Sequence, residues 1–212
     1  ISRAHLVNAA DRLNRLYPEL EVLPVCADFN QPFELPVPQR KPRRSAVYFP
    51  GSTLGNFGPA EAVRLLDHMR RLAGPGGALL LGVDLRKDPE VLQRAYDDAA
   101  GVTAVFNLNI LEGINRELDG NFDLGRFRHR AVYNEAEGCI EMHLVSQGSQ
   151  VVRVADESFG FHDGEHVLSE RSYKYSLDGL AALAVRAGMT VEQQWLDDRR
   201  YFCVACLRPK HS

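Results

Sequence analysis

The sequence has little of what would place a protein in a membrane or outside the cell. Its 212 residues contain no apolar run close to the ~20 residues that cross a bilayer. The N-terminus opens directly into an amphipathic segment, so no signal peptide is visible. The chain has only four cysteines, and a chain of this length can bury a core without disulfides. We therefore expect a cytoplasmic protein with no membrane partner.

An excess of one charge is also missing. The chain has 25 basic and 28 acidic residues, a formal net charge of −3, which gives no general attraction to nucleic acid. A basic cluster at Arg40, Lys41, Arg43 and Arg44 could touch a phosphate. No aromatic side chains accompany it, so we interpret it as a solvated loop. We expect no nucleic-acid partner, and the sequence does not indicate the oligomeric state.

Two short motifs invite a metal or redox interpretation. Cys203 and Cys206 form a C-x-x-C within an apolar run that reads as a buried strand. Residues three apart on a strand point to opposite faces, so the two thiols should diverge. His162 and His166 flank Gly164, which argues against a helix that would align them. We expect no metal site.

What the sequence does contain is an alternation of helices and strands. Ser2 can cap an amphipathic helix, and residues 22–29 read as a short strand ending at Asp28. A buried strand over 45–49 precedes a helix that begins near Pro59. Residues 78–84 are continuously apolar, as in a strand that is covered on both faces. This order predicts a parallel sheet with crossover helices.

The pattern changes after Asp84 and resumes at Ser176. Two helices, one opened by Asp88 and Pro89 and one over 105–118, precede segments with strand alternation. A further helix capped by Ser176 leads to a final pair of strands. The sequence thus predicts an α/β core formed by residues 1–86 and 177–212, with an inserted α+β subdomain over 87–176. The strand segments of the insertion are 128–134, 139–146, 150–155 and 165–176.

Two strand ends carry residues suited to a ligand, because open α/β sheets bind ligands beyond the carboxyl ends of their strands. Asp28 and Phe29 end one strand, where a carboxylate can accept an amine hydrogen bond. The segment GSTLGN, which begins at Gly51, follows the next one with small residues. These features favour a methyltransferase core over a dehydrogenase. The Gly-rich turn that opens such folds is missing, so we expect the chain to be part of a longer protein.

Several long motifs follow one another in order. They are YFPGSTLGNF, DLRKDPEVLQRAYDDAAGVTAVFNLNILEGINREL, IEMHLVS, GEHVLSERSYKYS and AGMTVEQQWLDDRRYFCVACL. In these motifs the chain resembles the histidine-specific Nα-methyltransferase family of ergothioneine biosynthesis over nearly its whole length. The resemblance implies a Rossmann-like class I methyltransferase core with an inserted substrate-binding subdomain. It also implies S-adenosylmethionine as co-substrate and up to three methyl transfers to the α-amine of histidine.

The resemblance further assigns site residues. Asp28, Phe29 and Gly51 would contact the cofactor, and Asn56 and Tyr96 would hold the substrate carboxylate. Glu170 and Ser172 would bind the imidazole. Thr53, Phe106 and Met142 would line the pocket. No residue is expected to act as acid or base, because the reaction needs mainly positioning of a neutral amine.

Each of these residues also has an ordinary structural interpretation. Asn56 suits a sharp turn after Gly55, and Tyr96 lies on the apolar face of its helix. Met142 is core as well as pocket wall. A methyltransferase for another small amine and a non-catalytic binding fragment remain alternatives.

Glu170 and Ser172 are the most informative pair. Positions two apart on a strand share a face, so the two side chains converge. Together they would bind a ring with two nitrogens better than an apolar group. The alternative is a solvated strand face that also carries His166 and Lys174.

Overall fold

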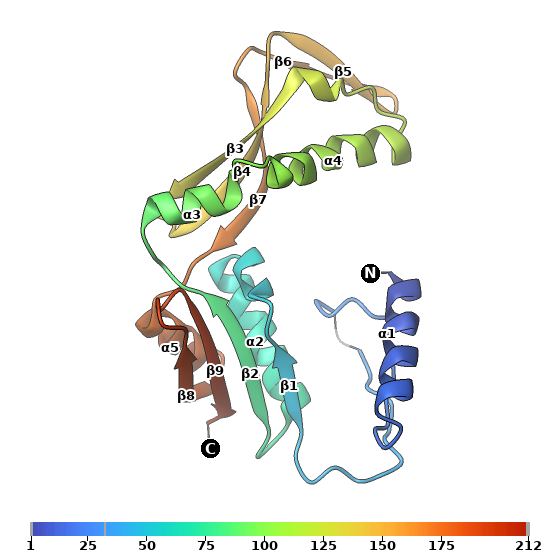
Figure 1. Ribbon diagram of the computed structural model, residues 1–212, viewed down its shortest axis with the longest axis vertical. Coiled ribbons are helices and arrows are strands. Elements are labelled where there is room, and N and C mark those ends of the chain that lie inside the picture. The colour runs from blue at the N-terminus through green and yellow to red at the C-terminus, as the bar shows by residue number, and fades with distance from the viewer. Residues whose placement is uncertain (1, 32, 211–212) are drawn as a thin grey trace.

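The computed structural model describes residues 2–31 and 33–210. They form a lower and an upper layer in Figure 1, each a sheet with its own helices, and the two are joined end to end. The lower layer in Figure 1 holds the sheet of β1, β2, β8 and β9, and the upper layer holds the rest of the strands. The helices and 3₁₀ turns are α1 (Arg3–Leu16), η1 (Thr53–Asn56), α2 (Pro59–Ala73), α3 (Pro89–Tyr96), α4 (Val102–Glu117), η2 (Leu124–Arg126) and α5 (Leu177–Arg186). The strands are β1 (Ala46–Phe49), β2 (Ala78–Asp84), β3 (Phe127–Asn134), β4 (Cys139–Ser146), β5 (Gln150–Val154), β6 (Glu157–Phe161), β7 (His166–Tyr173), β8 (Met189–Leu196) and β9 (Phe202–Pro209).

The core sheet has the order β1-β2-β9-β8. β1 and β2 are parallel, with α2 as their crossover, which confirms the predicted parallel pair. β9 runs antiparallel to both β2 and β8, so the predicted terminal strands form a hairpin at the sheet edge.

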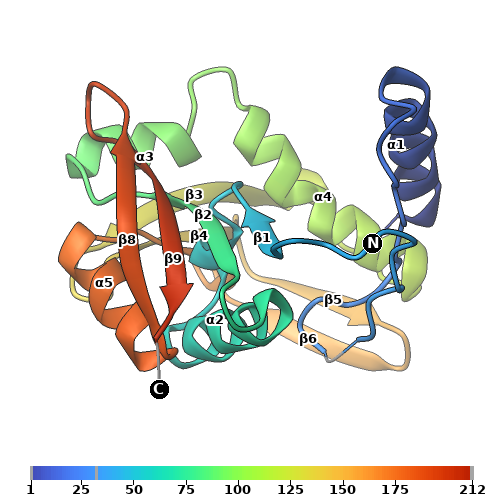
Figure 2. The same cartoon turned by 90° about the horizontal axis from the view of Figure 1, so that it is seen from below.

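Helices α2 and α5 pack together on one face of this sheet (Figure 2). Leu79, Leu81 and Val83 of β2 are fully buried beneath them, whereas the alternate residues Ala78 and Leu80 are only partly buried. The expectation that β2 is covered on both faces is therefore wrong for the residues that the structure describes. A continuous apolar run does not reveal how many helices cover it.

The second sheet has the order β3-β4-β7, with every neighbour antiparallel. Helices α3 and α4, both predicted, pack against β3 and β4. The separate hairpin of β5 and β6 extends beyond this sheet. β6 has no clear signal in the sequence, because polar residues and Gly160 outnumber its two phenylalanines.

Residues 22–29 do not form the expected strand. They run without strand pairing to any described residue, and an apolar segment becomes a strand only when a neighbour accepts its hydrogen bonds. Phe29 is still anchored, because its ring meets Phe49 and Phe57 edge to face at 5.8 and 6.3 Å between centroids. The preceding α1, capped by Ser2 as predicted, buries only Ala10 and lies apart from the sheets in both views.

The chain leaves the core sheet after Asp84 and returns to the same place at Tyr175. Leu85 and Tyr175 form an isolated parallel bridge. The Tyr175 N–H donates to the Asp84 carbonyl at 3.1 Å, and the Arg86 N–H donates to the Tyr175 carbonyl at 2.9 Å. This crossing point joins the two sheets. Across the described ranges, no helix combines the length and the apolar character that a membrane span needs.

Candidate functional site

The loop after β1 is fixed between the two sheets. Ser52 adopts a left-handed conformation with φ 56°, and its hydroxyl accepts a hydrogen bond from the Asp84 N–H at 2.9 Å. Gly55 lies so close to β7 that an added Cβ would come within 2.8 Å of the Tyr173 carbonyl oxygen. η1 therefore presents Thr53 and the exposed Asn56 beside the strand that carries the predicted imidazole-binding residues.

Strand β7 places Glu170 and Ser172 on one face, as predicted from their spacing. Ser172 lies opposite Ile140 of β4, and Glu170 lies opposite Met142. Tyr96, the last residue of α3, brings its hydroxyl to 2.9 Å from the Ser172 hydroxyl. Met142 is buried in the cluster against which the Tyr96 ring packs. The structure thus brings Tyr96, Met142 and Ser172 together, with Glu170 next to them.

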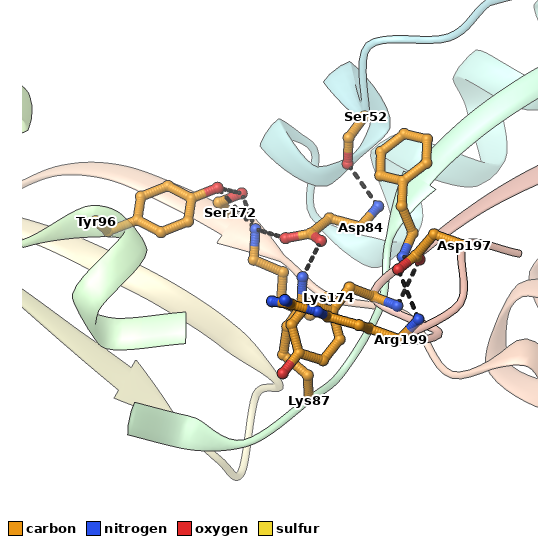
Figure 3. A network of polar contacts seen from close by, with 10 residues as sticks. Ser52, Asp84, Lys87, Tyr96, Ser172, Lys174, Asp197 and Arg199 are labelled. Atoms are coloured by element: carbon orange, nitrogen blue, oxygen red, sulfur yellow. Dashed lines mark hydrogen bonds and ion pairs between the residues drawn. The ribbon is translucent and has the colours of Figure 1, made fainter. Parts of the chain in front are cut away.

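Lys174 is a residue of this cluster that the sequence did not single out. Its ammonium lies 2.7 Å from the Tyr96 hydroxyl, 2.9 Å from the Ser172 hydroxyl and 2.9 Å from the Asp84 carboxylate (Figure 3). Lys174 is only 3% exposed, which contradicts the alternative of a solvated face at this position. A buried ammonium needs such partners, because an unpaired charge in the interior is costly. Asp84 also pairs with Lys87.

The protons of this cluster can be counted. The Lys174 ammonium has three N–H donors and meets three acceptors, so both hydroxyls accept one hydrogen bond from it. The contact between Tyr96 and Ser172 uses one of their two O–H groups. The other O–H remains for a ligand. The Tyr96 and Ser172 hydroxyls therefore offer one O–H donor to a ligand, and the Lys174 ammonium fixes the position of both oxygens.

A histidine of β3, His129, forms a hydrogen bond with the last residue of α3. A carbonyl can only accept, so Nε2 of His129 donates to the Tyr96 carbonyl at 2.7 Å, and Nδ1 lies 2.9 Å from the Asn107 amide nitrogen. Asn107 is fully buried on α4. Its neighbour Phe106 faces outward and is 62% exposed, so the structure does not bring Phe106 into the buried cluster around Tyr96.

Glu170 occupies a partly buried position on β7. Burial raises the pKa of its carboxyl group above the ordinary value, and the nearby Lys174 ammonium opposes that rise. A desolvated carboxylate of this kind gains from a ligand N–H, since each charge-assisted hydrogen bond replaces lost water.

A cavity of about 580 Å³ lies between residues 28–31 and helix α2, with Phe57 also in its lining. Its volume is within the usual range for small-molecule sites. Asp28 contributes an exposed carboxylate, one oxygen of which accepts from the Asn30 N–H at 2.9 Å. Phe29 and Phe57 contribute an aromatic wall. These residues fit an adenosine group. Gly51, exposed directly after β1, does not line this cavity.

The cysteine and histidine motifs, for which the sequence predicts no metal site, lie outside both the Lys174 cluster and the cavity beside Phe29. Cys203 is buried, whereas the Cys206 thiol faces Glu192 on the opposite side of β9, 3.6 Å from its carboxylate. His166 lies on β7 and its ring meets that of His143 at 4.7 Å between centroids. Among residues 2–31 and 33–210, no three His, Cys, Asp or Glu side chains are grouped as metal ligands.

The chain is similar to known methyltransferases both in its fold and in its sequence. The fold is similar to that of the CcbJ methyltransferase from Streptomyces caelestis, with a TM-score of 0.52 and 15% identity over 99% of this chain and 77% of that one. The chain is 42% identical to the histidine N-alpha-methyltransferase of Mycolicibacterium smegmatis over 91% of this chain and 60% of that protein. It is 28% identical to the L-tryptophan methyltransferase trpM of Psilocybe serbica over 78% of this chain and 47% of that protein.

The likeness to CcbJ shows the fold alone, a Rossmann-like class I methyltransferase fold. The chain spans about half to 60% of the length of the two curated relatives. A family model described as histidine-specific, S-adenosylmethionine-dependent methyltransferase matches residues 1–209, and the chain belongs to that family.

Proposed function

We propose that the protein transfers methyl groups from S-adenosylmethionine to the α-amine of L-histidine, up to the trimethylated betaine. The observation that carries this proposal is the face of β7, where Glu170 and Ser172 point the same way beside Tyr96. A carboxylate and a hydroxyl at this spacing can satisfy both nitrogens of an imidazole. An apolar side chain in that position would leave both groups unpaired, so the site selects for a ring with two nitrogens.

Each residue has a binding or positioning role in this proposal. Asp28, Phe29 and Gly51 contact the cofactor, with Asp28 accepting from its polar groups. Asn56 and Tyr96 hold the substrate carboxylate, with Tyr96 donating the one O–H that its contact with Ser172 leaves free, so that Ser172 accepts from the imidazole. Glu170 and Ser172 hold the imidazole, and Thr53, Phe106 and Met142 line the pocket. The 62% exposure of Phe106 means that it would have to turn inward when substrate binds.

The reaction needs no acid, base or metal from the protein. The cofactor supplies a methyl group on a positively charged sulfur, which is already a good leaving group. The substrate must present a neutral amine, and a free α-amine with a pKa of about 8 can lose its proton to water. The protein contributes orientation, which is worth roughly 7–11 kcal/mol of barrier in favourable cases.

We also propose that residues 87–176 are the substrate-binding insertion and that 1–86 and 177–212 are the methyltransferase core. The bridge between Leu85 and Tyr175 supports this division, because the chain enters and leaves the second sheet at one point. The cytoplasm is the expected compartment, and four unpaired cysteines agree with a reducing environment.

The alternative within the same class is a methyltransferase for another small amine. The likeness to a relative named for tryptophan supports it, since that substrate has one ring nitrogen. The alternative from another class is a binding fragment without activity.

The test is incubation of the full-length protein with S-adenosylmethionine and a panel of amino acids, followed by mass spectrometry. We expect mass gains of one to three methyl groups on histidine alone. Glu170→Ala should weaken histidine binding about tenfold or more, because it removes a charge-assisted hydrogen bond, while cofactor binding is retained. Glu157→Ala, an exposed glutamate of β6, is the matched control. Methylation of another amino acid, or of none, would overturn the proposal.

A further inference from the structure

A second hollow, of about 840 Å³, lies at the opposite end of the core sheet. It is found where β1 and β2 begin and β9 ends, near the C-terminus in Figure 1. β2 runs from this hollow to Asp84, and its seven residues span about 20 Å. The hollow is therefore separate from the cluster around Lys174, and it shares Arg71 of α2 with the lining of the cavity beside Phe29.

The walls of this hollow are strongly basic. The cations come from three segments that are distant in the sequence: the loop before β1, the end of α2 and the end of β9. They are Arg43, Arg44, Arg70, Arg71, Arg208 and Lys210. Two carboxylates, Asp67 and Glu192, lie against them. Six cations and two carboxylates leave a local excess of four positive charges in a chain whose net charge is −3.

Two of the guanidinium groups are held in fixed orientations. Asp67 accepts from Nε and Nη2 of Arg70 at 2.9 and 2.7 Å. Glu192 accepts from Nε of Arg208 at 2.9 Å, and Nη1 of Arg208 donates to the Gly77 carbonyl at 3.3 Å. An orientation that is already fixed lowers the entropy lost when a ligand binds.

Other cations of the hollow have no such partner. Within the described residues, Arg43, Arg44 and Lys210 form no ion pair. Like charges gathered at one place repel each other, and a multivalent anion relieves that repulsion more than monovalent salt does. The hollow is thus suited to an anion with several charges.

We propose that this hollow binds an oligophosphate anion. Arginine forks match phosphate oxygens, and the glycine turn of residues 74–77 lets a ligand approach the backbone closely. No aromatic side chain lines the hollow, so there is no platform on which a base could stack, and the phosphates are the part that is recognised. The volume suits a small molecule rather than a polymer groove. This binding is independent of the methyl-transfer substrate.

The probe is inorganic tripolyphosphate, titrated into the protein by calorimetry at constant ionic strength. We expect one binding site, with sulfate and monophosphate binding much more weakly. The double variant Arg43→Gln/Arg44→Gln should lose about tenfold or more in affinity, because it removes two cations from the site. Arg12→Gln/Arg15→Gln on α1 makes the same charge change at a distance and should keep the affinity.

A second measurement separates this site from the cofactor cavity. Saturating S-adenosylmethionine should leave tripolyphosphate binding unchanged, since the two sites share only Arg71 among their described lining residues and Arg71 already pairs with Asp67. The proposal is overturned if the cofactor abolishes binding, if both double variants lose affinity equally, or if tripolyphosphate binds no better than sulfate. Binding to vesicles that carry phosphorylated lipid headgroups but not to free tripolyphosphate would also overturn it.

Discussion

The ammonium of Lys174 lies 2.9 Å from the carboxylate of Asp84, and this ion pair joins the two sheets of the molecule. Asp84 ends β2 of the core sheet, whereas Lys174 directly follows β7 of the second sheet. The Lys174 side chain is 1% exposed and that of Asp84 is 21% exposed, so solvent screens the pair little. The same ammonium orients the hydroxyls of Tyr96 and Ser172.

The first prediction concerns the coupling of this pair. Lys174→Met and Asp84→Asn should each lower the free energy of unfolding, and the double variant should lose less than the sum of the two. We expect a coupling energy above about 1 kcal/mol, because each single change leaves a buried charge with fewer partners. Chemical denaturation of the four proteins in the cycle measures it.

The exposed pair Glu90 and Arg94 on α3 is the control for that cycle. Their side chains are 81% and 70% exposed, so their coupling should be only about 0.3–0.5 kcal/mol. Equal coupling in the two cycles would contradict the role of Lys174 as a buried link between the sheets.

The second prediction concerns the hydroxyl pair. Tyr96→Phe removes the phenol O–H that faces the substrate carboxylate, and the O–H that remains lies on Ser172, 2.9 Å from where the phenol oxygen was. The carboxylate therefore loses the donor at the position of Tyr96. We expect the KM for histidine to rise about tenfold or more, in line with loss of a hydrogen bond to a charged group. The dissociation constant for S-adenosylmethionine should stay the same.

Tyr133→Phe is the matched control, since Tyr133 packs against the same apolar cluster. A similar rise in KM for both variants would point to loss of packing rather than to loss of the hydroxyl donor.

Sequence alone predicts some of this site well and some not at all. The common face of Glu170 and Ser172 follows from strand alternation, which depends only on neighbours along the chain. The burial of Lys174 does not, because it depends on Asp84, a residue of the other sheet. The same limit explains the missing strand at 22–29 and the single covered face of β2. Periodicity reports local character, whereas pairing and coverage depend on distant segments.

The third prediction concerns pH. The pKa of Glu170 is raised by burial, so in the folded state this carboxyl group holds its proton at higher pH than it does in the unfolded chain. The ionised form therefore costs stability, and that cost disappears as pH falls through the folded pKa. Glu170→Gln should raise the melting temperature at pH 7, with a smaller gain at pH values below the folded pKa.

The same substitution should weaken histidine binding at pH 7, because a neutral amide accepts an imidazole N–H less strongly than a carboxylate does. In the unmodified protein, histidine affinity should fall as pH drops through the pKa of Glu170. A melting temperature that falls in Glu170→Gln at pH 7 would show that the carboxylate stabilises the fold instead.

The last prediction concerns the contact between η1 and β7. Gly55→Ala places a methyl group 2.8 Å from the Tyr173 carbonyl oxygen, and backbone cannot move aside as a flexible side chain can. We expect a loss of about 1–3 kcal/mol in unfolding free energy, as for other overpacked sites. The shifted loop also carries Asn56, so the KM for histidine should rise. Gly113→Ala in α4 meets no atom within 4 Å and should instead gain about 0.5–1 kcal/mol, since alanine favours a helix. If both alanine variants were equally stable and equally active, η1 would not be held against β7, and the placement of Asn56 beside this strand would be wrong.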